Sequence, residues 1–376
     1  MFSLHIDTAR TWRGGQNQVL LTVNGLRALG HRASLVAHPD GELRRRAQEG
    51  LDFIPLASRA EMDLSAAWRL SRIVKRLKPD ILHAHDAHAT AMASLALSFG
   101  APTPAPALVV SRRVDFHLQD NSFSRWKHRQ VDCFIAASEA VRRMLIADGV
   151  PAERVVTVHE GIDLDHVLAA PPVDIHAEFW LPHHAPVVGN VAALVPHKGQ
   201  RHLVEAAHLV VREIPDARFL ILGEGELREH LERLIREYHL EKHVLLPGFR
   251  VDALGCIKSF DLFVMSSVTE GLGTSLLDAM ACSRAIVATR AGGIPEIVED
   301  GRTGVLVEPH DHHALAREIV RLLKDDELRR RIGEAGRARV AERFTVERMV
   351  AGTVAVYERV AGRPHQADIA RQPAPD

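Results

Sequence analysis

The feature that most constrains the fold of this chain is an alternation of short apolar stretches with amphipathic segments along its first half. Strand-like stretches occur in FSLHID, ASLVA, FIPLA, DILHAH, ALVVSRR and CFIAAS. Helical periodicity fills the segments between several of them, as in NQVLLTVNGLRAL, LSAAWRLSRIVKRL, ATAMASLALSF and EAVRRMLIAD. Alternation of this kind predicts a parallel sheet with helices on both faces.

The same pattern restarts in the second half, after an interruption at residues 169–186 where prolines cluster. Its strand-like stretches are PVVGNVAAL, RFLILG, HVLLPG, LFVMSS, AIVAT and GVLVEP, and its helices include GQRHLVEAAHLVVREI, ELREHLERLIREY and GTSLLDAMAC. A chain of 376 residues suits two domains of about 100–200 residues each. We therefore predict α/β domains at 1–168 and 187–345, joined by a linker at 169–186.

Two doubly wound domains bind ligands at the carboxyl ends of their strands, so we expect the functional site in a cleft between two facing sheets. After GVLVEPH the sequence contains three helical stretches with little strand signal between them. We expect the last of these, at 346–362, to pack back on the N-terminal domain. Residues 363–376 are polar and contain prolines, which predicts a disordered tail.

The composition argues against several classes of protein. Lys and Arg number 47 and Asp and Glu number 48, so no overall charge favours nucleic acid as a partner. The three cysteines are far apart, lie in apolar segments and form no C-x-x-C pair, which is typical of buried thiols in a reducing compartment. The N-terminus lacks the features of a signal peptide, and no long apolar run could span a membrane. We therefore expect a cytoplasmic protein.

The most specific stretch is SSVTEGLGTSLLDAMACSRAIVAT at 266–289. A predicted strand ends just before it, and a predicted helix starts near Thr274. The glycines between them let the backbone approach a ligand, and the free N–H groups at the helix start face an anion. This predicts a phosphate cradle, with Glu270 at its lip and Asp278 further along the helix. Taken alone, the pattern also fits a solvated loop acid and an exposed helix acid.

A second stretch, ILHAHDAHAT at 81–90, places three histidines and an aspartate within six positions. His83 and His85 project to the same side of a predicted strand, at its carboxyl end. The spacing comes close to the H-x-H-x-D-H zinc motif, but Asp86 stands one place too early. Three interpretations stay open: a polar site for a ligand, a buried structural cluster, or a metal site that draws further ligands from elsewhere.

Several motifs in order resemble the family-4 retaining glycosyltransferases, and the resemblance covers nearly the whole chain. The family pattern E-G-F-G-x-x-x-x-E-A-M-A-x-G-x-P-V-V-A matches the stretch from Glu270, with Asp278 in the place of the second acid. RGGQNQVLLTVNGLRALGHRASLV looks like the family's glycine loop and first helix. IAASEAVRRML, VVTVHEGID, LVPHKGQRHLVEA, LILGEGELREHLERL and AGGIPEIVEDGRTGVLVEPHD continue the likeness. The resemblance implies the GT-B architecture, two Rossmann-like domains facing across a cleft.

The resemblance also implies roles for individual residues. In the donor domain, Glu270 would contact the transferred sugar, Lys198 would neutralise the leaving diphosphate, and Asp278 would bind the ribose hydroxyls. The residues implied to hold the rest of the donor are Gly14, Gly15, Gly248, Arg250, Gly271, Leu272, Gly273 and Thr274. In the H-x-H-[DE] pattern, His85 would contact the reacting sugar and Asp86 would orient His85 or the acceptor. His83 is expected to be a buried, hydrogen-bonded strand residue.

Three departures from the family pattern bear on the donor site. Ala193 stands where the family usually has an Arg, five residues before the Lys of K-G, so one cation is missing. Arg112, Arg113 or Arg201 are candidates to replace that cation. Asp278 is one methylene shorter than Glu, and Ser283 replaces a turn glycine.

The resemblance implies a retaining, front-face transfer from a nucleotide diphosphate sugar, with a UDP-sugar most expected, to a glycan or lipid-linked acceptor. No D-x-D motif lies near a donor loop, so neither a metal nor a cofactor is expected. Basic and aromatic residues at 111–130, which include Arg112 and Arg113, could hold an acceptor, as could the basic helix WRLSRIVKRLK. Such patches also fit a solvated helix face, and they fit peripheral contact with the inner face of a membrane. We expect a role in cell-envelope polysaccharide or lipopolysaccharide synthesis.

Two alternatives keep the architecture but change the function. A nucleotide-sugar epimerase would release a new sugar without any acceptor, and a phosphorylase would need a pyridoxal phosphate lysine, for which no motif is apparent. A non-catalytic protein that binds nucleotide sugars is motivated by Ala193 and Asp278.

Overall fold

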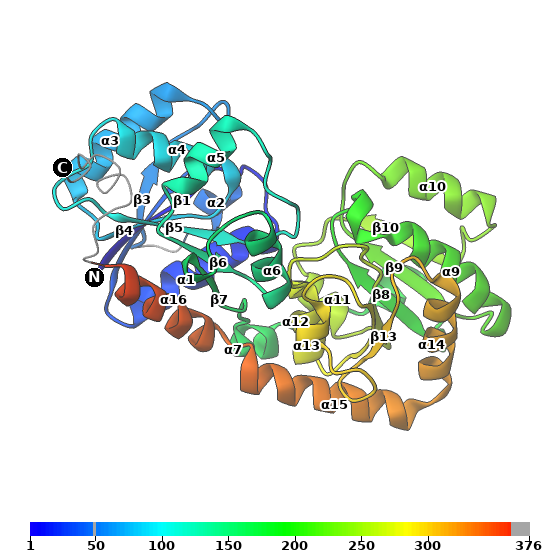
Figure 1. The fold of residues 1–376 in the computed structure, drawn as a ribbon. Coiled ribbons are helices and arrows are strands. Elements are labelled where there is room, and N and C mark those ends of the chain that lie inside the picture. The colour runs from blue at the N-terminus through cyan, green and yellow to red at the C-terminus, as the bar shows by residue number, and fades with distance from the viewer. Residues whose placement is uncertain (48–49, 362–376) are drawn as a thin grey trace. The chain divides into compact units, whose positions relative to one another are not determined.

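The computed structural model describes residues 1–47 and 50–361, which fall into two compact units (Figure 1). The first unit comprises residues 1–161 together with the C-terminal segment from Val346, and the second comprises Ile162–Thr345. Among the described residues, no helix is both long enough and apolar enough to cross a bilayer.

The first unit is built on a seven-stranded sheet in which neighbouring strands are parallel, in the order β3-β2-β1-β4-β5-β6-β7. Its strands are β1 (Phe2–Asp7), β2 (Arg32–Ala37), β3 (Asp52–Pro55), β4 (Ile81–Ala84), β5 (Ala107–Arg112), β6 (Cys133–Ala136) and β7 (Val155–Thr157). Its helices are α1 (Gly14–Ala28), α2 (Glu42–Arg46), α3 (Leu64–Leu77), α4 (Ala87–Ser98), α5 (Ser122–Arg129), α6 (Glu139–Ala147), the 3-10 turn η1 (Ala152–Arg154) and α16 (Val346–Val360).

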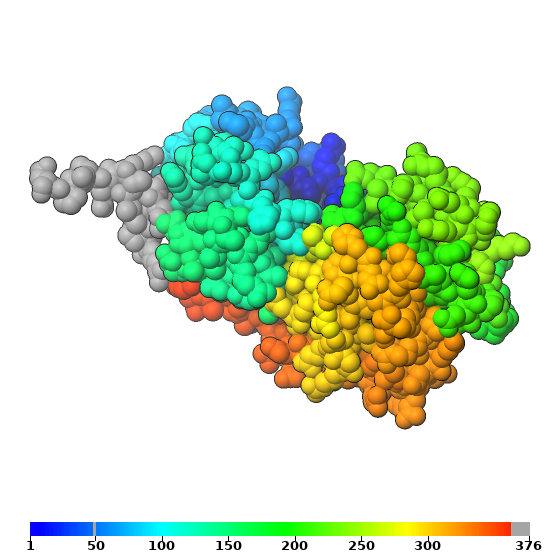
Figure 2. Space-filling view, turned by 45° about the vertical axis from the view of Figure 1, so that its right-hand side comes forward, coloured from blue at the N-terminus to red at the C-terminus, as the bar shows by residue number. Residues whose placement is uncertain are grey.

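Helices cover both faces of this sheet, as the alternating pattern predicts. Apolar residues of α3 and α4 pack with one face of the strands. Those of α1 and α16 pack with the other face, where Val350, Val356 and Tyr357 of α16 are buried. In the space-filling view α16 lies along the edge of the first unit (Figure 2). The C-terminal helix is therefore part of the core of the first unit.

The second unit contains a six-stranded sheet, also parallel between neighbours, in the order β10-β9-β8-β11-β12-β13. Its strands are β8 (Val187–Val191), β9 (Arg218–Leu222), β10 (Val244–Gly248), β11 (Leu262–Met265), β12 (Ala285–Thr289) and β13 (Val305–Val307). Its helices are α7 (Leu164–Ala169), α8 (Ile175–Glu178), the 3-10 turn η2 (Pro196–Lys198), α9 (Gln200–Glu213), α10 (Arg228–Glu237), α11 (Ala253–Ile257), α12 (Thr274–Ala281), α13 (Ile294–Ile297), α14 (His312–Lys324) and α15 (Asp326–Arg343).

The two sheets share one topology. In each sheet the first strand lies between the second and the fourth, so the winding direction reverses between β1 and β4 and again between β8 and β11. In open parallel sheets a crevice forms at such a switch point, outside the carboxyl ends of the strands. The fold therefore marks one edge position in each unit where ligands are expected.

The predicted linker at 169–186 differs from what the structure shows. The division between the units falls between Gly161 and Ile162, and α8 and its flanking residues belong to the second unit. The Val173 amide donates to the Gly255 carbonyl at 3.1 Å, and the Ser259 hydroxyl donates to the Val173 carbonyl at 2.6 Å. The prolines interrupt helical periodicity here, but the backbone is still paired with α11 and its flank. The predicted tail at 363–376 lies outside the described residues.

Candidate active site

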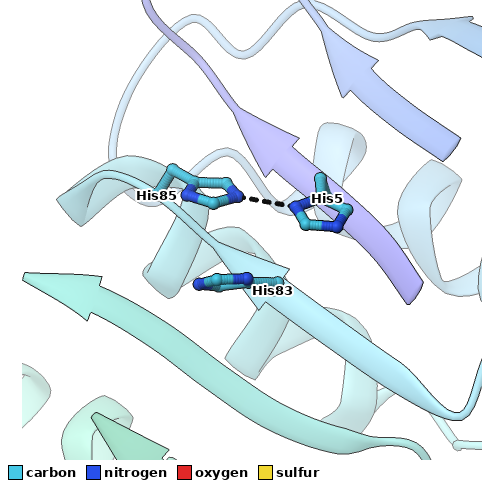
Figure 3. Close-up of side chains that lie close together, drawn as sticks. All are labelled: His5, His83 and His85. Carbon is cyan, nitrogen blue, oxygen red and sulfur yellow. Dashed lines mark hydrogen bonds between the residues drawn. The ribbon is translucent and has the colours of Figure 1, made fainter. Parts of the chain in front are cut away.

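Three histidines lie at the switch point of the first unit (Figure 3). His5 on β1 is the register partner of His83 on β4, and His85 follows two residues after His83. All three side chains are buried. The ring centroids of His83 and His85 are 4.1 Å apart, and the rings of His5 and His85 lie edge to edge and nearly parallel, with centroids 5.2 Å apart. Parallel pairing of β1 with β4 thus brings together residues about eighty positions apart.

The hydrogen bonds of this cluster have a defined direction. Arg113 Nη1 lies 3.1 Å from His85 Nδ1, and a guanidinium can only donate. Neutral His85 therefore carries its proton on Nε2, which lies 2.9 Å from His5 Nδ1. His5 must then accept on Nδ1 and donate from Nε2, which lies 3.0 Å from the Ser3 hydroxyl.

The chain of donors continues through the C-terminal helix. The Ser3 hydroxyl is hydrogen bonded to Tyr357 on α16, and Tyr357 Oη lies 2.5 Å from His83 Nδ1. His83 Nε2 in turn lies 2.8 Å from the Ser111 hydroxyl. We assign the Ser3 hydroxyl as donor to Tyr357, because burial raises the Tyr357 pKa and this hydrogen bond lowers it. Tyr357 then donates to Nδ1 of His83, and all three histidines are Nε2–H tautomers. His83 is thus the buried, hydrogen-bonded strand residue that the sequence indicates.

The electrostatics keep this cluster neutral. Burial, and then the nearby Arg113 guanidinium, lower the pKa of His5 to about 3. Burial likewise holds the pKa of His83 and of His85 well below the usual value. A metal ion here would have to displace hydrogen bonds that engage both nitrogens of every ring, and it would lie beside a cation. The arrangement therefore fits a structural network better than a metal centre.

Arg113 links this network to the glycine loop at the start of α1. Its Nε lies 2.9 Å from Glu160 Oε1 in a largely buried ion pair. A Cβ added to Gly15 would lie 3.8 Å from Arg113 Cδ, so the two are in contact, and Gly14 beside it is exposed. Arg112 points elsewhere and donates to the Phe116 carbonyl, because successive side chains of a strand face opposite ways. Of the two arginines in the sequence prediction, Arg113 alone contacts the histidines.

The hydrogen bonds of Asp86 go to Thr8 and Ala89 rather than to His85, and its expected role toward the acceptor stays a prediction. Its Oδ1 caps α4 by accepting from the Ala89 amide at 2.7 Å, and it also accepts from the Thr8 hydroxyl at 2.9 Å. Its Oδ2 accepts from the Thr8 amide at 2.6 Å. Among the described residues His85 is oriented by His5 and Arg113 rather than by Asp86. Asp86 instead fixes the loop that follows β1.

A small cavity of about 20 Å³ adjoins the network; His83, Ser111, Arg113 and Glu160 line it together with apolar residues such as Ile135, Val158 and Met349. Its volume suits about one water molecule. Ser111, which ends the chain of donors, thus lines a space that also borders the Arg113–Glu160 pair.

The switch point of the second unit holds an ion pair between two residues of the sequence prediction. Lys198 Nζ, at the end of η2, lies 2.5 Å from Glu270 Oε2, in the loop between β11 and α12. The Lys198 side chain is 19% exposed and that of Glu270 is 9% exposed. Ser267 Oγ also donates to Glu270 Oε2 at 3.1 Å. These contacts fix an ammonium and a carboxylate at the carboxyl edge of the sheet.

The loop after Glu270 is shaped by glycines. Gly273 has a φ of 96° and immediately precedes α12, whose first residue is Thr274. Gly271 and Leu272 are buried between them. A Cβ on Gly292 would lie 1.8 Å from the Glu270 carbonyl oxygen, so only glycine lets the chain pass beneath Glu270. A Cβ on Gly273 would lie 3.4 Å from Glu270 Cγ, so the start of α12 is close to Glu270, and the phosphate cradle there stays a prediction.

Asp278 lies one turn into α12 and is partly buried. Burial raises its pKa to about 7. A carboxyl group with such a pKa exchanges its proton near neutrality, so a partner that donates hydrogen bonds, such as a diol, would favour the ionised form.

The segment expected to face the base is held by ion pairs. Gly248 ends β10 with a φ of 88°. Arg250 donates through Nε and Nη2 to Asp252 at 2.7 and 2.6 Å and also pairs with Glu178 of α8. The Arg250 guanidinium therefore ties α8 to the loop after β10, and the Gly248 carbonyl accepts from the Gly223 amide at 2.8 Å.

Ala193 stands where the family usually has an arginine, and its backbone carbonyl accepts a hydrogen bond from a neighbouring side chain. The Gln200 side chain donates to the Ala193 carbonyl at 2.9 Å. Arg201, a candidate replacement in the same unit, pairs instead with Glu205 on α9 at 2.8 Å. Lys198 is thus the cation that the described residues place against Glu270.

Sequence reasoning missed several residues of both sites: Ser3, His5, Glu160, Ser267 and Tyr357. His5 carries a weak signal, because it is a polar residue inside an apolar strand. Tyr357 carries none beyond its place in an amphipathic helix, since its partner His83 lies 274 positions earlier.

Two parallel doubly wound sheets, each with polar groups at its switch point, define the class of two-domain α/β proteins with the GT-B fold. Residues 174–339 match the family model described as Glycosyl transferases group 1, and residues 12–166 match the model described as Glycosyltransferase Family 4. The chain belongs to the family-4, group 1 glycosyltransferases and is a transferase enzyme.

The relatives are glycosyltransferases, several of them in the synthesis of envelope or other polysaccharides. N-acetyl-alpha-D-glucosaminyl L-malate synthase of Bacillus anthracis is 28% identical over 300 residues, which cover 78% of each chain. The lipopolysaccharide core biosynthesis glycosyltransferase LpsE of Rhizobium meliloti is 28% identical over 297 residues, 79% of this chain and 80% of the relative. The crystal structure of Anabaena Alr3699/HepE in complex with UDP has a TM-score of 0.81 at 21% identity, covering 96% of this chain and all of that one.

Proposed function

We propose that this chain is a retaining glycosyltransferase that moves a sugar from a nucleotide diphosphate sugar, a UDP-sugar, to a glycan or lipid-linked acceptor of the cell envelope. The observation that carries the proposal is the Lys198–Glu270 pair at the switch point of the second unit. An epimerase or a non-catalytic binding protein is not favoured, because the relatives are glycosyltransferases.

The pair supplies what transfer from a sugar diphosphate needs. The leaving group carries two negative phosphates, and Lys198 with the first amides of α12 would stabilise the charge that develops on it. Glu270, anchored by Lys198 and Ser267, would accept hydrogen bonds from sugar hydroxyls. Asp278 would bind the ribose hydroxyls. That UDP and UDP-glucose bind the Anabaena protein of the same fold supports the choice of donor.

In a front-face transfer the acceptor hydroxyl attacks from the side on which the diphosphate departs. A departing phosphate oxygen would take the acceptor proton, so catalysis consists of positioning and charge stabilisation. For His85 to contact the reacting sugar, it must release its bond to Arg113 or to His5, since these bonds engage both ring nitrogens. We propose that, when His85 releases its bond to Arg113, the Arg113 guanidinium faces the acceptor or the donor phosphates. The reaction is proposed to need neither a metal ion nor a cofactor.

An exposed surface of the first unit supports a membrane-linked acceptor. Met62, Leu64 and Trp68 at the start of α3 are 58%, 56% and 51% exposed. The Arg72 guanidinium lies over the Trp68 ring, and further exposed cations follow along the helix at Arg69, Lys75, Arg76 and Lys78. Apolar side chains beside a row of cations are typical of contact with an anionic bilayer.

Vesicles test this part of the proposal. Trp68→Ala is expected to weaken co-sedimentation with phosphatidylglycerol vesicles several-fold, whereas Trp180→Ala, which removes an exposed tryptophan of the second unit, should not. Equal binding of the two variants and the wild type would contradict a membrane surface on α3.

The transfer itself is tested by product analysis. Purified protein is incubated with UDP-sugars and envelope glycan or lipid fractions, and UDP release and the anomeric proton signal of the product are recorded. A product with the anomeric configuration of the donor is expected, and Glu270→Gln is expected to lower the rate about 100-fold or more with the fold intact. Glu213→Gln, at an exposed lysine pair, is the control. An inverted product would contradict the retaining mechanism, and full activity of Glu270→Gln would contradict the site.

A further inference from the structure

A second group of histidines lies in the second unit, where α9 packs against α14. His202 and Glu205 are one turn apart on α9, and His312 is the first residue of α14. His202 Nδ1 lies 2.9 Å from Glu205 Oε2, and His312 Nδ1 lies 3.6 Å from the same oxygen. One ligand atom from each residue lies within 4.8 Å of the others. Two imidazoles thus converge on one carboxylate oxygen.

The separations of the two imidazole nitrogens from the Glu205 oxygen fit a metal ion. Zinc binds histidine nitrogen and carboxylate oxygen at about 2.0–2.2 Å in a tetrahedron, which places neighbouring ligand atoms about 3.3 Å apart. The two nitrogen–oxygen separations, 2.9 and 3.6 Å, lie on either side of that value. Two histidines and one glutamate are also a ligand set that zinc uses in sites with an open position. His202 and His312 are 20% and 33% exposed, so water can reach the fourth position.

The remaining polar atoms of His202 and Glu205 are already oriented. His202 Nε2 lies 3.0 Å from His310 Nδ1, so His202 can donate away from the metal while its Nδ1 binds. Arg201 Nε donates to Glu205 Oε1 at 2.8 Å and leaves Oε2 to the ion. The ring of His310 meets that of His202 edge-on, with the centroids 4.9 Å apart. Outer partners of this kind fix tautomer and direction in metal sites.

The buried histidines of the first unit lack these properties. Their nitrogens are all engaged with one another or with hydroxyl groups, the Arg113 cation lies beside them, and they surround no carboxylate oxygen. Glu205, by contrast, brings a negative charge to the centre of its group. Of the two groups, that around Glu205 is the one whose chemistry suits a cation.

We propose that His202, Glu205 and His312 bind a divalent transition metal ion, zinc above all, with His310 and Arg201 as outer partners. The ion joins the first turn of α9 to the first turn of α14 and so stabilises the second unit. This site is separate from the transfer reaction and does not depend on its assignment.

Binding is measured on the full chain after treatment with chelator, by calorimetric titration with zinc chloride and by the melting temperature with and without zinc. The wild type is expected to bind one zinc ion at this site and to melt at a higher temperature when loaded. His312→Ala and Glu205→Gln are each expected to lose this binding, and His310→Ala to weaken it about 10-fold. The zinc-free melting temperature of each variant shows whether it is folded.

His184→Ala is the matched control, because His184 is an exposed histidine beside a single carboxylate, Asp216. It should bind zinc as the wild type does. The proposal is overturned if the wild type binds no zinc, or if His312→Ala and Glu205→Gln bind it with unchanged affinity and stoichiometry. The second result would place the ion at another group, such as the histidines of the first unit.

Discussion

At the scale of single residues, the directed hydrogen bonds of the first unit make Tyr357 a positioning residue for the histidines. Tyr357→Phe removes the donor to His83 Nδ1 and leaves a buried acceptor without it. The free energy of unfolding is expected to fall by about 1–3 kcal/mol. Urea unfolding measures this change, and nitrogen-15 NMR of the imidazole rings reports the tautomer of His83.

The chain contains two tyrosines, so Tyr238→Phe is a matched control. Tyr238 packs its ring on His208 at the end of α10 and should tolerate the change within about 0.5 kcal/mol. If Tyr357→Phe were as stable as Tyr238→Phe, or if His83 were an Nδ1–H tautomer in the wild type, the proposed direction of the network would be wrong.

A second prediction at this scale concerns pH. Burial raises the pKa of Asp278 from 3.8 to about 7, so between these values the folded state keeps a proton that the unfolded state has released. The contribution of Asp278 to stability is therefore lost as the pH rises through this window. Asp278→Asn stays neutral, so its melting temperature relative to the wild type should increase from pH 5 to pH 8. A difference that is the same at both values would contradict the raised pKa.

At the scale of elements, the turn beneath Glu270 depends on a glycine. Gly292→Ala would place a Cβ 1.8 Å from the Glu270 carbonyl oxygen at a φ of 48°. Gly301→Ala is a control with a similar φ, 74°, and nothing within 4 Å of the added Cβ. The control is expected to cost about 1–2 kcal/mol from the backbone alone. Gly292→Ala should cost about 1–3 kcal/mol more and also weaken UDP binding, because the loop must move. Denaturant unfolding with UDP calorimetry checks both, and equal effects would contradict the close contact.

The elements also show how far sequence alone could reach. Short, continuous apolar stretches between helical segments identify β1, β4, β8 and β11, because parallel strands buried on both faces are apolar throughout. The three-residue strand β7 and the short helix α8 are too brief to show a period, so the pattern missed them.

In the candidate site, too, local motifs could be predicted from sequence and long-range contacts could not. Glu270, Lys198 and the glycine loop are visible in sequence because their motifs are local. The pairing of Lys198 with Glu270 spans 72 positions, and that of His5 with His85 spans 80. Such contacts depend on which strands are neighbours, and no local pattern determines that.

At the scale of the whole molecule, the first unit depends on a helix that follows the second unit in the chain. A chain shortened to residues 1–345 lacks α16, whose Val350, Val356 and Tyr357 are buried in the first unit. The first unit is expected to lose protection from hydrogen exchange, while the second unit keeps it. The control is a chain shortened to residues 1–361, which keeps α16. Unchanged protection of the first unit in the 1–345 chain would contradict the role of α16.

The central claim, a donor site at the switch point of the second unit, is tested most directly by thermal shift with UDP, GDP, ADP and their sugar conjugates. The wild type and the control Lys324→Ala, which breaks an exposed pair with Glu213, should melt at a higher temperature with a UDP compound, and Lys198→Ala should respond much less. No shift of the wild type with any compound, or an equal shift of Lys198→Ala, would contradict the claim.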